Sequence, residues 1–157
     1  MSIEVAAFKN TLLTLLPETF GVSDAPNGYL LDHGRAGLLG TLADVAAATA
    51  SARLRPENAT IAAHTNHILL LLDLYVGYDR GERPQADWEG SWQTPLVDPA
   101  AWDNLRGSVQ ARYDTVISLI QTRTEWPEPS VAGALVLLAH VAYHLGEIKQ
   151  ILTSLQK

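Results

Sequence analysis

Two histidines four residues apart, His140 and His144, carry the clearest chemical signal in this sequence. On a helix, residues at i and i+4 lie on one face, one turn apart, and two imidazoles placed in this way can bind one divalent metal ion. The surrounding run, residues 131–145, is strongly apolar, so we expect both rings to point into a protein core. A buried polar ring needs a partner. A metal ion with a third ligand from another segment is one such partner, and hydrogen bonds to neighbouring groups are the alternative.

The third ligand has to come from a different segment, and His64 and His67 are the candidates. Both lie near a helical stripe of apolar side chains that includes Ile68, Leu71 and Tyr75. On a helical wheel His64 lies nearer the centre of this stripe and His67 nearer one side. Periodicity therefore does not select His67 and slightly favours His64, with the other histidine beside the site or at its rim.

Other side chains near these histidines have both a chemical and a structural interpretation. Glu147 projects close to the sector of His140 and His144, where it could orient a ligand or act as a base on metal-bound water. Trp92 and Tyr143 are candidates for the wall of a substrate pocket, although packing alone would explain both. His33, near the start of its segment, is predicted to be partly exposed or to cap a helix.

The apolar periodicity of nearly every long segment predicts a helix, and no segment reads convincingly as a strand. A short first helix should end at or before Pro17. Asn58 and Asp98 are predicted to be N-caps, and Asp98 is followed by a proline at the first helical position. Four longer helices are expected, over about 29–50, 59–77, 99–120 and 131 to near the C-terminus.

These elements predict an all-α fold in which a four-helix bundle occupies residues 29–155 of a single domain, 1–157. Residues 1–20 would form an additional short N-terminal helical extension. Glycines in the segment 34–40 either weaken the start of its helix or mark close helix packing. A long loop, residues 80–99, contains two tryptophans, and long loops in compact domains are often functional.

Composition restricts the partners. The chain has 157 residues, of which 47% are apolar, and a formal charge of −6, so nucleic acid is an unexpected partner. No polybasic cluster suggests an anionic membrane surface, and the longest apolar run is shorter than the ~20 residues that a membrane span needs. Because the chain has no cysteine and its first residues lack a basic region, we expect a cytoplasmic location.

Three motifs together resemble the DinB-like superfamily of four-helix bundle proteins, which includes bacillithiol- and mycothiol-dependent transferases. The first is TIAAHTNHI at 60–68, and the second is DWEGSW at 87–92 in the long loop. The third is HVAYHLGEI at 140–148, which is similar to the family pattern H-x-x-x-H-x-G-[QEA]-I. The resemblance covers roughly residues 29–155. Many members have a tryptophan eight residues before the first ligand, where this chain has Ala59, a difference that affects packing at the start of the helix more than metal ligation.

The resemblance implies a mononuclear metal site with the ligands His67, His140 and His144. His67 is carried over from the family by counting from the start of its helix. Three neutral imidazoles would leave a coordination position open, and zinc or nickel is the expected metal, with iron or manganese as alternatives. Metal affinity should fall below pH ~6.5, where free histidine becomes protonated.

Three functions follow as hypotheses. The first is a metal-dependent transferase that uses a small thiol cofactor on an electrophilic small molecule. The second is a metal-dependent hydrolase with Glu147 as the base, and the third is a non-catalytic stress protein that binds metal or a small ligand. The expected partner is a small-molecule substrate, and the resemblance adds a possible homodimer.

Overall fold

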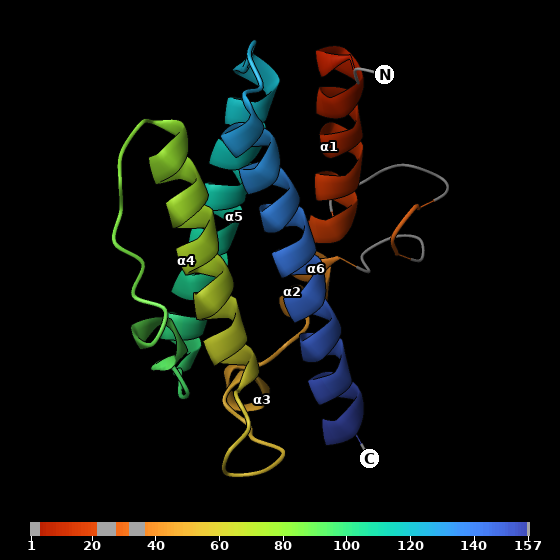
Figure 1. Cartoon of the computed structure of the whole chain (residues 1–157). Helices are drawn as coiled ribbons and strands as arrows, with labels where there is room; N and C mark the ends of the chain where they lie inside the picture. The colour runs from red at the N-terminus through yellow and green to blue at the C-terminus, as the bar shows by residue number, and fades with distance from the viewer. Residues whose placement is uncertain (1–3, 22–27, 32–36, 157) are drawn as a thin grey trace.

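The computed structural model describes residues 4–21, 28–31 and 37–156, and every regular element in these ranges is helical (Figure 1). The all-α prediction is therefore confirmed. The elements are α1 (Val5–Phe20), α2 (Leu38–Ala43), α3 (Ala47–Ala50), α4 (Ile61–Asp79), the 3₁₀ turn η1 (Gly90–Trp92), α5 (Pro99–Thr122) and α6 (Glu128–Leu155).

The four longest helices share one core. Both α1 and α4 pack against α5 and α6, so that α1 and α4 occupy opposite corners of the arrangement. In Figure 1 the red α1 and the yellow-green α4 stand on either side of α5 and α6. The packing of α4 against α6 is the contact that brings the histidine-bearing segments together.

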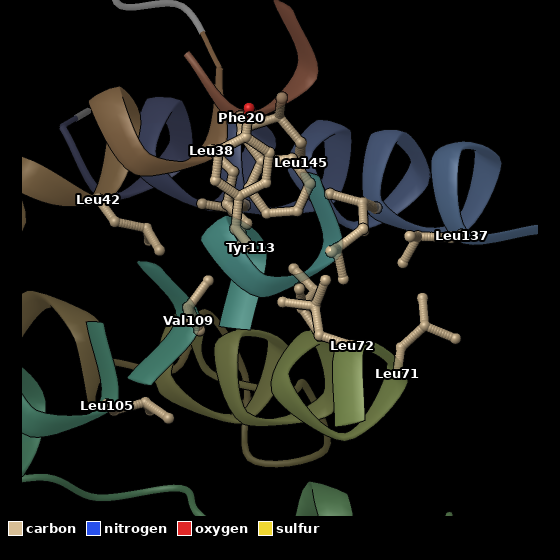
Figure 2. Close-up of a cluster of buried hydrophobic side chains, with 14 of the residues drawn as sticks. Phe20, Leu38, Leu42, Leu71, Leu72, Leu105, Val109, Tyr113, Leu137 and Leu145 are labelled. Carbon is tan, nitrogen blue, oxygen red and sulfur yellow. The ribbon is translucent and has the colours of Figure 1, made fainter. Parts of the chain in front are cut away.

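The N-terminal helix is part of this core and not an extension outside it, so that expectation is wrong. Leu12, Leu16 and Phe20 of α1 are almost completely buried. The ring of Phe20 stacks on that of Tyr113 from α5, with 4.3 Å between centroids, and Figure 2 shows this pair among the core side chains. Burying side chains of this size removes apolar surface from water that an isolated helix would leave exposed.

Helix α1 also continues past Pro17, where the sequence predicted its end. Proline removes one backbone donor, but only one turn from the C-terminus, and the burial of Phe20 favours keeping that turn helical. The helix ends instead at Gly21, whose positive φ of 81° is a conformation that glycine adopts without strain. Its amide donates to the carbonyl oxygens of Pro17 and Glu18 at 3.0 and 3.2 Å.

The predicted helix over 29–50 is wrong as a continuous element. The described part of this segment contains only the short helices α2 and α3, separated by residues 44–46. Gly37 explains part of the difference, because a Cβ on this residue would lie 2.0 Å from the amide nitrogen of Gly21. The glycine thus marks a close approach of two backbones, as one of the two interpretations proposed. His33 and Gly34 lie outside the described residues.

A buried carboxylate holds the chain that follows α1. Glu18 accepts hydrogen bonds from the backbone amides of Tyr29, Leu30 and Leu31, at 2.9, 2.6 and 2.6 Å. Burial alone would raise the pKa of Glu18, but these three donors outweigh it and lower the pKa. The charged carboxylate thereby fixes a non-helical segment to the end of α1.

The last helix is longer than the apolar run within it. By length and composition α6 would be able to cross a membrane, with 28 residues and a mean hydropathy of 1.5 in its most apolar window. In this structure it packs against α1 and α4, and Val141, Leu145 and Ile148 are buried in the shared core. Such packing is also typical of the core helix of a globular domain.

The N-caps of α4 and α5 test the predictions directly. Asp98 caps α5 as predicted, since its carboxylate accepts from the amide of Ala101 at 2.7 Å. The cap of α4 is Thr60 and not Asn58, because the Thr60 hydroxyl accepts from the amide of Ala63 at 3.1 Å and is fully buried. Asn58 is exposed and lies two residues before the cap.

We expect Thr60→Val to destabilise the protein by about 1 kcal/mol or somewhat more, because it leaves a buried amide without its acceptor while keeping the shape of the side chain. Asn58→Ala should change the free energy of unfolding by less than about 0.5 kcal/mol. Urea unfolding of both variants measures the difference. Equal losses of unfolding free energy in the two variants would contradict the assignment of the N-cap to Thr60 rather than Asn58.

Candidate metal centre

Three histidines from two packed helices meet inside the protein. His67 comes from α4, and His140 and His144 come from α6. One ring nitrogen of each lies within 4.8 Å of the others. The side chains of His67 and His144 are 5% and 4% exposed, and His140 is half-buried. The spacing of His140 and His144 therefore does place both rings on one inward face, and α4 provides the third ring opposite them.

The tautomer of His67 follows from a chain of hydrogen bonds. The hydroxyl of Ser91 donates to the carbonyl oxygen of Trp88 at 2.7 Å, so its oxygen is free to accept. Nδ1 of His67 lies 2.7 Å from that oxygen and is therefore the donor. This leaves the lone pair on Nε2, which faces Nε2 of His140 at 3.0 Å. A hydrogen bond at the far nitrogen is how proteins orient a histidine that binds metal.

The turn η1 places Ser91 in this position. Asp87 accepts a hydrogen bond from the amide of Gly90 at 2.8 Å, which closes the turn. A Cβ at Gly90 would lie 2.1 Å from a carboxylate oxygen of Asp87, so a larger residue there would displace the carboxylate that closes the turn. The side-chain amide of Asn66 donates to the carbonyl oxygen of Ser91 at 2.8 Å. Asn66 and His67, adjacent on α4, thus both hold the loop against the helix.

His64 lies beside the group rather than in it. Its Nδ1 is 3.0 Å from Nδ1 of His144, and its side chain is 7% exposed. The slight preference for His64 from the helical wheel is not supported, since His67 is the histidine of α4 that completes the cluster. If Nδ1–H of His144 donates to His64, the Nε2 lone pair of His144 is available to a ligand.

Aromatic rings cover the group from the loop side. Trp92 stacks on His67 with centroids 4.2 Å apart and an interplanar angle of 21°, and it contacts His64 and His144 edge-on. Tyr143 touches His144 at 4.9 Å but is 62% exposed. Trp92 therefore adjoins the histidines closely, whereas Tyr143 lies on the outer surface.

Burial favours the neutral form of all four imidazoles of the site, those of His64, His67, His140 and His144, because it lowers their pKa values. It lowers the pKa of His67 to about 4, with further contributions from His140 and His64. It lowers the pKa of His144 to about 3, where repulsion from the other three histidines adds to the effect. Burial also lowers the pKa of His140, and that of His64, where the charge of Glu147 opposes it. The expected loss of metal affinity just below pH 6.5 therefore moves to lower pH, because protons compete less well for these nitrogens.

Glu147 is not a member of the three-histidine group. Its side chain is exposed, and within the described ranges no hydrogen bond joins it to a histidine ring. It acts on the site through its charge, which raises the pKa of His64. A role for Glu147 as a base stays a prediction.

A cavity of about 510 Å³ lies next to the group, between α4, the loop after it and the first half of α6. Trp88 forms part of its wall and lies 5.7 Å from the ring of His67. Neither Trp92 nor Tyr143 lines this cavity, so the predicted pocket residues and the observed cavity differ. The physical reason is that η1 places Trp92 on the ring of His67, while Trp88, earlier in the same loop, lines the cavity.

Sequence reasoning missed the contribution of Ser91, whereas it noted Trp88 as one of the two tryptophans of the long loop. The pattern Asp87 to Gly90 is a signal for a tight turn that would have located Ser91 within the loop. Nothing local shows that this serine is buried, since its burial depends on Asn66 and His67 twenty-four or more residues earlier.

Comparison with models of known protein families gives no match for this chain, and comparisons with curated proteins and with solved structures give none either.

The donor set fits a divalent metal. Two nitrogens bound tetrahedrally at ~2.1 Å to one ion would lie about 3.4 Å apart, which is close to the 3.0 Å between the Nε2 atoms of His67 and His140. Neutral imidazole is a common ligand of zinc, nickel and iron, so the ligand type does not distinguish among these ions. The fixed tautomer of His67 presents a lone pair inward, so the group is arranged to accept a cation.

The lowered pKa values predict that the metal-free protein loses stability on mild acidification. Between the folded pKa values and the ordinary value of 6.5, the unfolded chain binds more protons, so the free energy of unfolding falls as pH falls. Each histidine contributes up to about 1.4 kcal/mol per pH unit in this window. Urea unfolding between pH 7.5 and 5 should show a smaller slope for the His67→Gln and His144→Gln double variant, and an unchanged slope would contradict neutral burial.

Proposed function

We propose that this protein binds one divalent metal ion through His67, His140 and His144 and uses it in chemistry on a small organic molecule. The observation that carries the proposal is the convergence of three ring nitrogens, one from each histidine, to within 4.8 Å in a largely buried setting. Structural metal sites usually supply four protein ligands, so three ligands favour a site with an open position.

Within this proposal the fold is a four-helix bundle of the DinB-like kind. Support comes from the four long helices that share one core and from the motif at 140–148, which provides two of the three histidines. The bundle would consist of α1, α4, α5 and α6, so the N-terminal helix takes the place that the sequence assigned to residues 29–50. Zinc or nickel is the proposed metal.

The residues around the histidines have distinct tasks in this proposal. A bound divalent ion would polarise a substrate or lower the pKa of a bound water or thiol. Ser91 holds the tautomer of His67 so that its Nε2 faces the group, and His64 would do the same for His144 by accepting a hydrogen bond from Nδ1–H of that ring. Trp92, stacked on His67, excludes water from one side of the group.

The reaction we favour is transfer of a small external thiol to an electrophilic substrate. The chain contains no cysteine, so a thiol nucleophile has to come from a cofactor such as bacillithiol or mycothiol. Hydrolysis with Glu147 as base ranks second, because that carboxylate is exposed and outside the histidine group. Binding of metal without catalysis is the third candidate.

Metal content tests the site itself. We expect about one equivalent of zinc or nickel in the purified protein, with loss in His67→Ala and in His144→Ala. His64→Ala and Ser91→Ala should still bind metal, with affinity about 10- to 100-fold lower, because each removes an orienting partner rather than a ligand. Metal analysis and competition with a chromogenic chelator measure both effects.

The reverse pattern, with metal retained in His67→Ala and lost in His64→Ala, would identify His64 as the third ligand. Circular dichroism of each variant checks that the helices remain folded.

Thiol transfer is tested with monochlorobimane as the electrophile and bacillithiol or mycothiol as the thiol. We expect conjugation above the uncatalysed rate that requires both metal and thiol and is abolished in His144→Ala. Turnover of esters or amides without thiol would favour the hydrolase instead. Metal-loaded protein that is inactive in both assays would indicate a binding protein.

A further inference from the structure

The cavity of about 510 Å³ has the size of a site for a small organic molecule. Its walls come mainly from the second half of α4, the loop at 81–88 and the first half of α6, and Arg123 at the end of α5 completes them. Leu71, Leu74 and Leu137 form its buried side. A concave space with such walls favours an apolar occupant, since filling it removes apolar surface from water.

The mouth of the cavity carries apolar side chains that nothing covers. Tyr78, Trp88 and Val136 all line it and are 58%, 46% and 55% exposed. They come from α4, the loop and α6 respectively. Large apolar side chains gathered around the opening of a cavity mark a surface that binds something. A molecule entering here would bury these side chains together.

The charged groups around the cavity balance one another. Asp79 and Arg123 both line it and form an ion pair, and the other charged lining residues are Glu82 and Arg83, one of each sign. Burial and the nearby carboxylate of Asp79 raise the pKa of Tyr75 to about 12, with Arg123 opposing this, so its hydroxyl stays protonated. The cavity therefore has no net charge to attract an ion, and Tyr75 supplies one polar group.

The cavity is one helical turn away from the histidines. Leu71 follows His67 by four residues on α4, and Leu137 precedes His140 by three on α6, which correspond to a rise of about 5 to 6 Å and 4 to 5 Å. Trp88 connects the two sites directly. Its ring lines the cavity and contacts His67, and its carbonyl oxygen accepts from Ser91, which in turn orients His67.

We infer that this cavity binds a neutral, largely apolar organic molecule and holds it one helical turn from the histidine group. In the setting of the proposed function, on which this second part rests, that molecule is the electrophilic substrate. Trp88 is then a specificity-determining residue, because it forms the wall between the apolar site and His67.

The test uses N-phenyl-1-naphthylamine, a neutral apolar dye whose fluorescence rises on leaving water, with full-length protein treated with EDTA. Gly133 lies on the cavity wall with open space before it, since a Cβ there would meet only the ring of Tyr75, at 4.0 Å. Gly133→Leu should therefore fill the cavity and raise the Kd of the dye by about tenfold or more. Gly107→Leu is the matched control, because Gly107 is also helical, has nothing within 4 Å of an added Cβ, and lies on α5 away from the cavity.

Saturable binding that is weakened in Gly133→Leu and unchanged in Gly107→Leu supports the cavity. Equal binding by both variants, or no binding by the unmodified protein, overturns it. The anionic analogue 8-anilinonaphthalene-1-sulfonate should bind more weakly than the neutral dye, and equal or tighter binding would overturn the neutral class of ligand.

A second measurement, with metal-loaded protein, distinguishes this inference from the proposed function. Protein loaded with Co²⁺ should quench the bound dye more than protein loaded with Zn²⁺, because quenching by the paramagnetic ion requires proximity. Dye binding without any metal uptake would contradict the proposed function while leaving the cavity in place. Metal uptake with no difference in quenching would contradict the adjacency of the two sites.

Discussion

Placing several imidazoles in an apolar core is the constraint on which the rest of this structure depends. Each buried ring loses hydration at both nitrogens, and a ring without partners would destabilise the fold. The protein satisfies the rings in pairs, His67 with His140 and His64 with His144, and uses Ser91 for the remaining nitrogen of His67. The same burial that makes these partners necessary keeps the rings uncharged and therefore able to bind a cation.

This constraint links elements that are far apart in sequence. The η1 turn is held on α4 through Ser91, and Trp88 reaches from the same loop to the neighbouring cavity. The loop is thus a structural partner of the histidines as well as a cover. Any molecule that displaces Trp88 would shift the carbonyl oxygen that accepts the hydrogen bond of the Ser91 hydroxyl, and through Ser91 it would change the orientation of His67.

The errors in predicting the helices have a common physical origin. Pro17 and Asn58 are strong local signals, yet α1 continues past the first, and the N-cap of α4 lies two residues after the second. In both cases burial decided the boundary, since Phe20 is drawn into the core and Thr60 is fully buried. Asp98 was predicted correctly because its cap and the proline after it need no tertiary contact to act. Local propensity is a weak prior where packing competes with it.

The sequence by itself determined the helical class and the pair His140 and His144, because both depend on the fixed 3.6-residue period of a helix. It also reduced the third ligand to two candidates on one helix. Only the tertiary structure placed His67 rather than His64 in the group of three, since this depends on the rotation of α4 against α6 and on where the loop places Ser91. The cavity beside them was also decided only by the tertiary structure, because its walls come from segments far apart in the sequence that folding brings together.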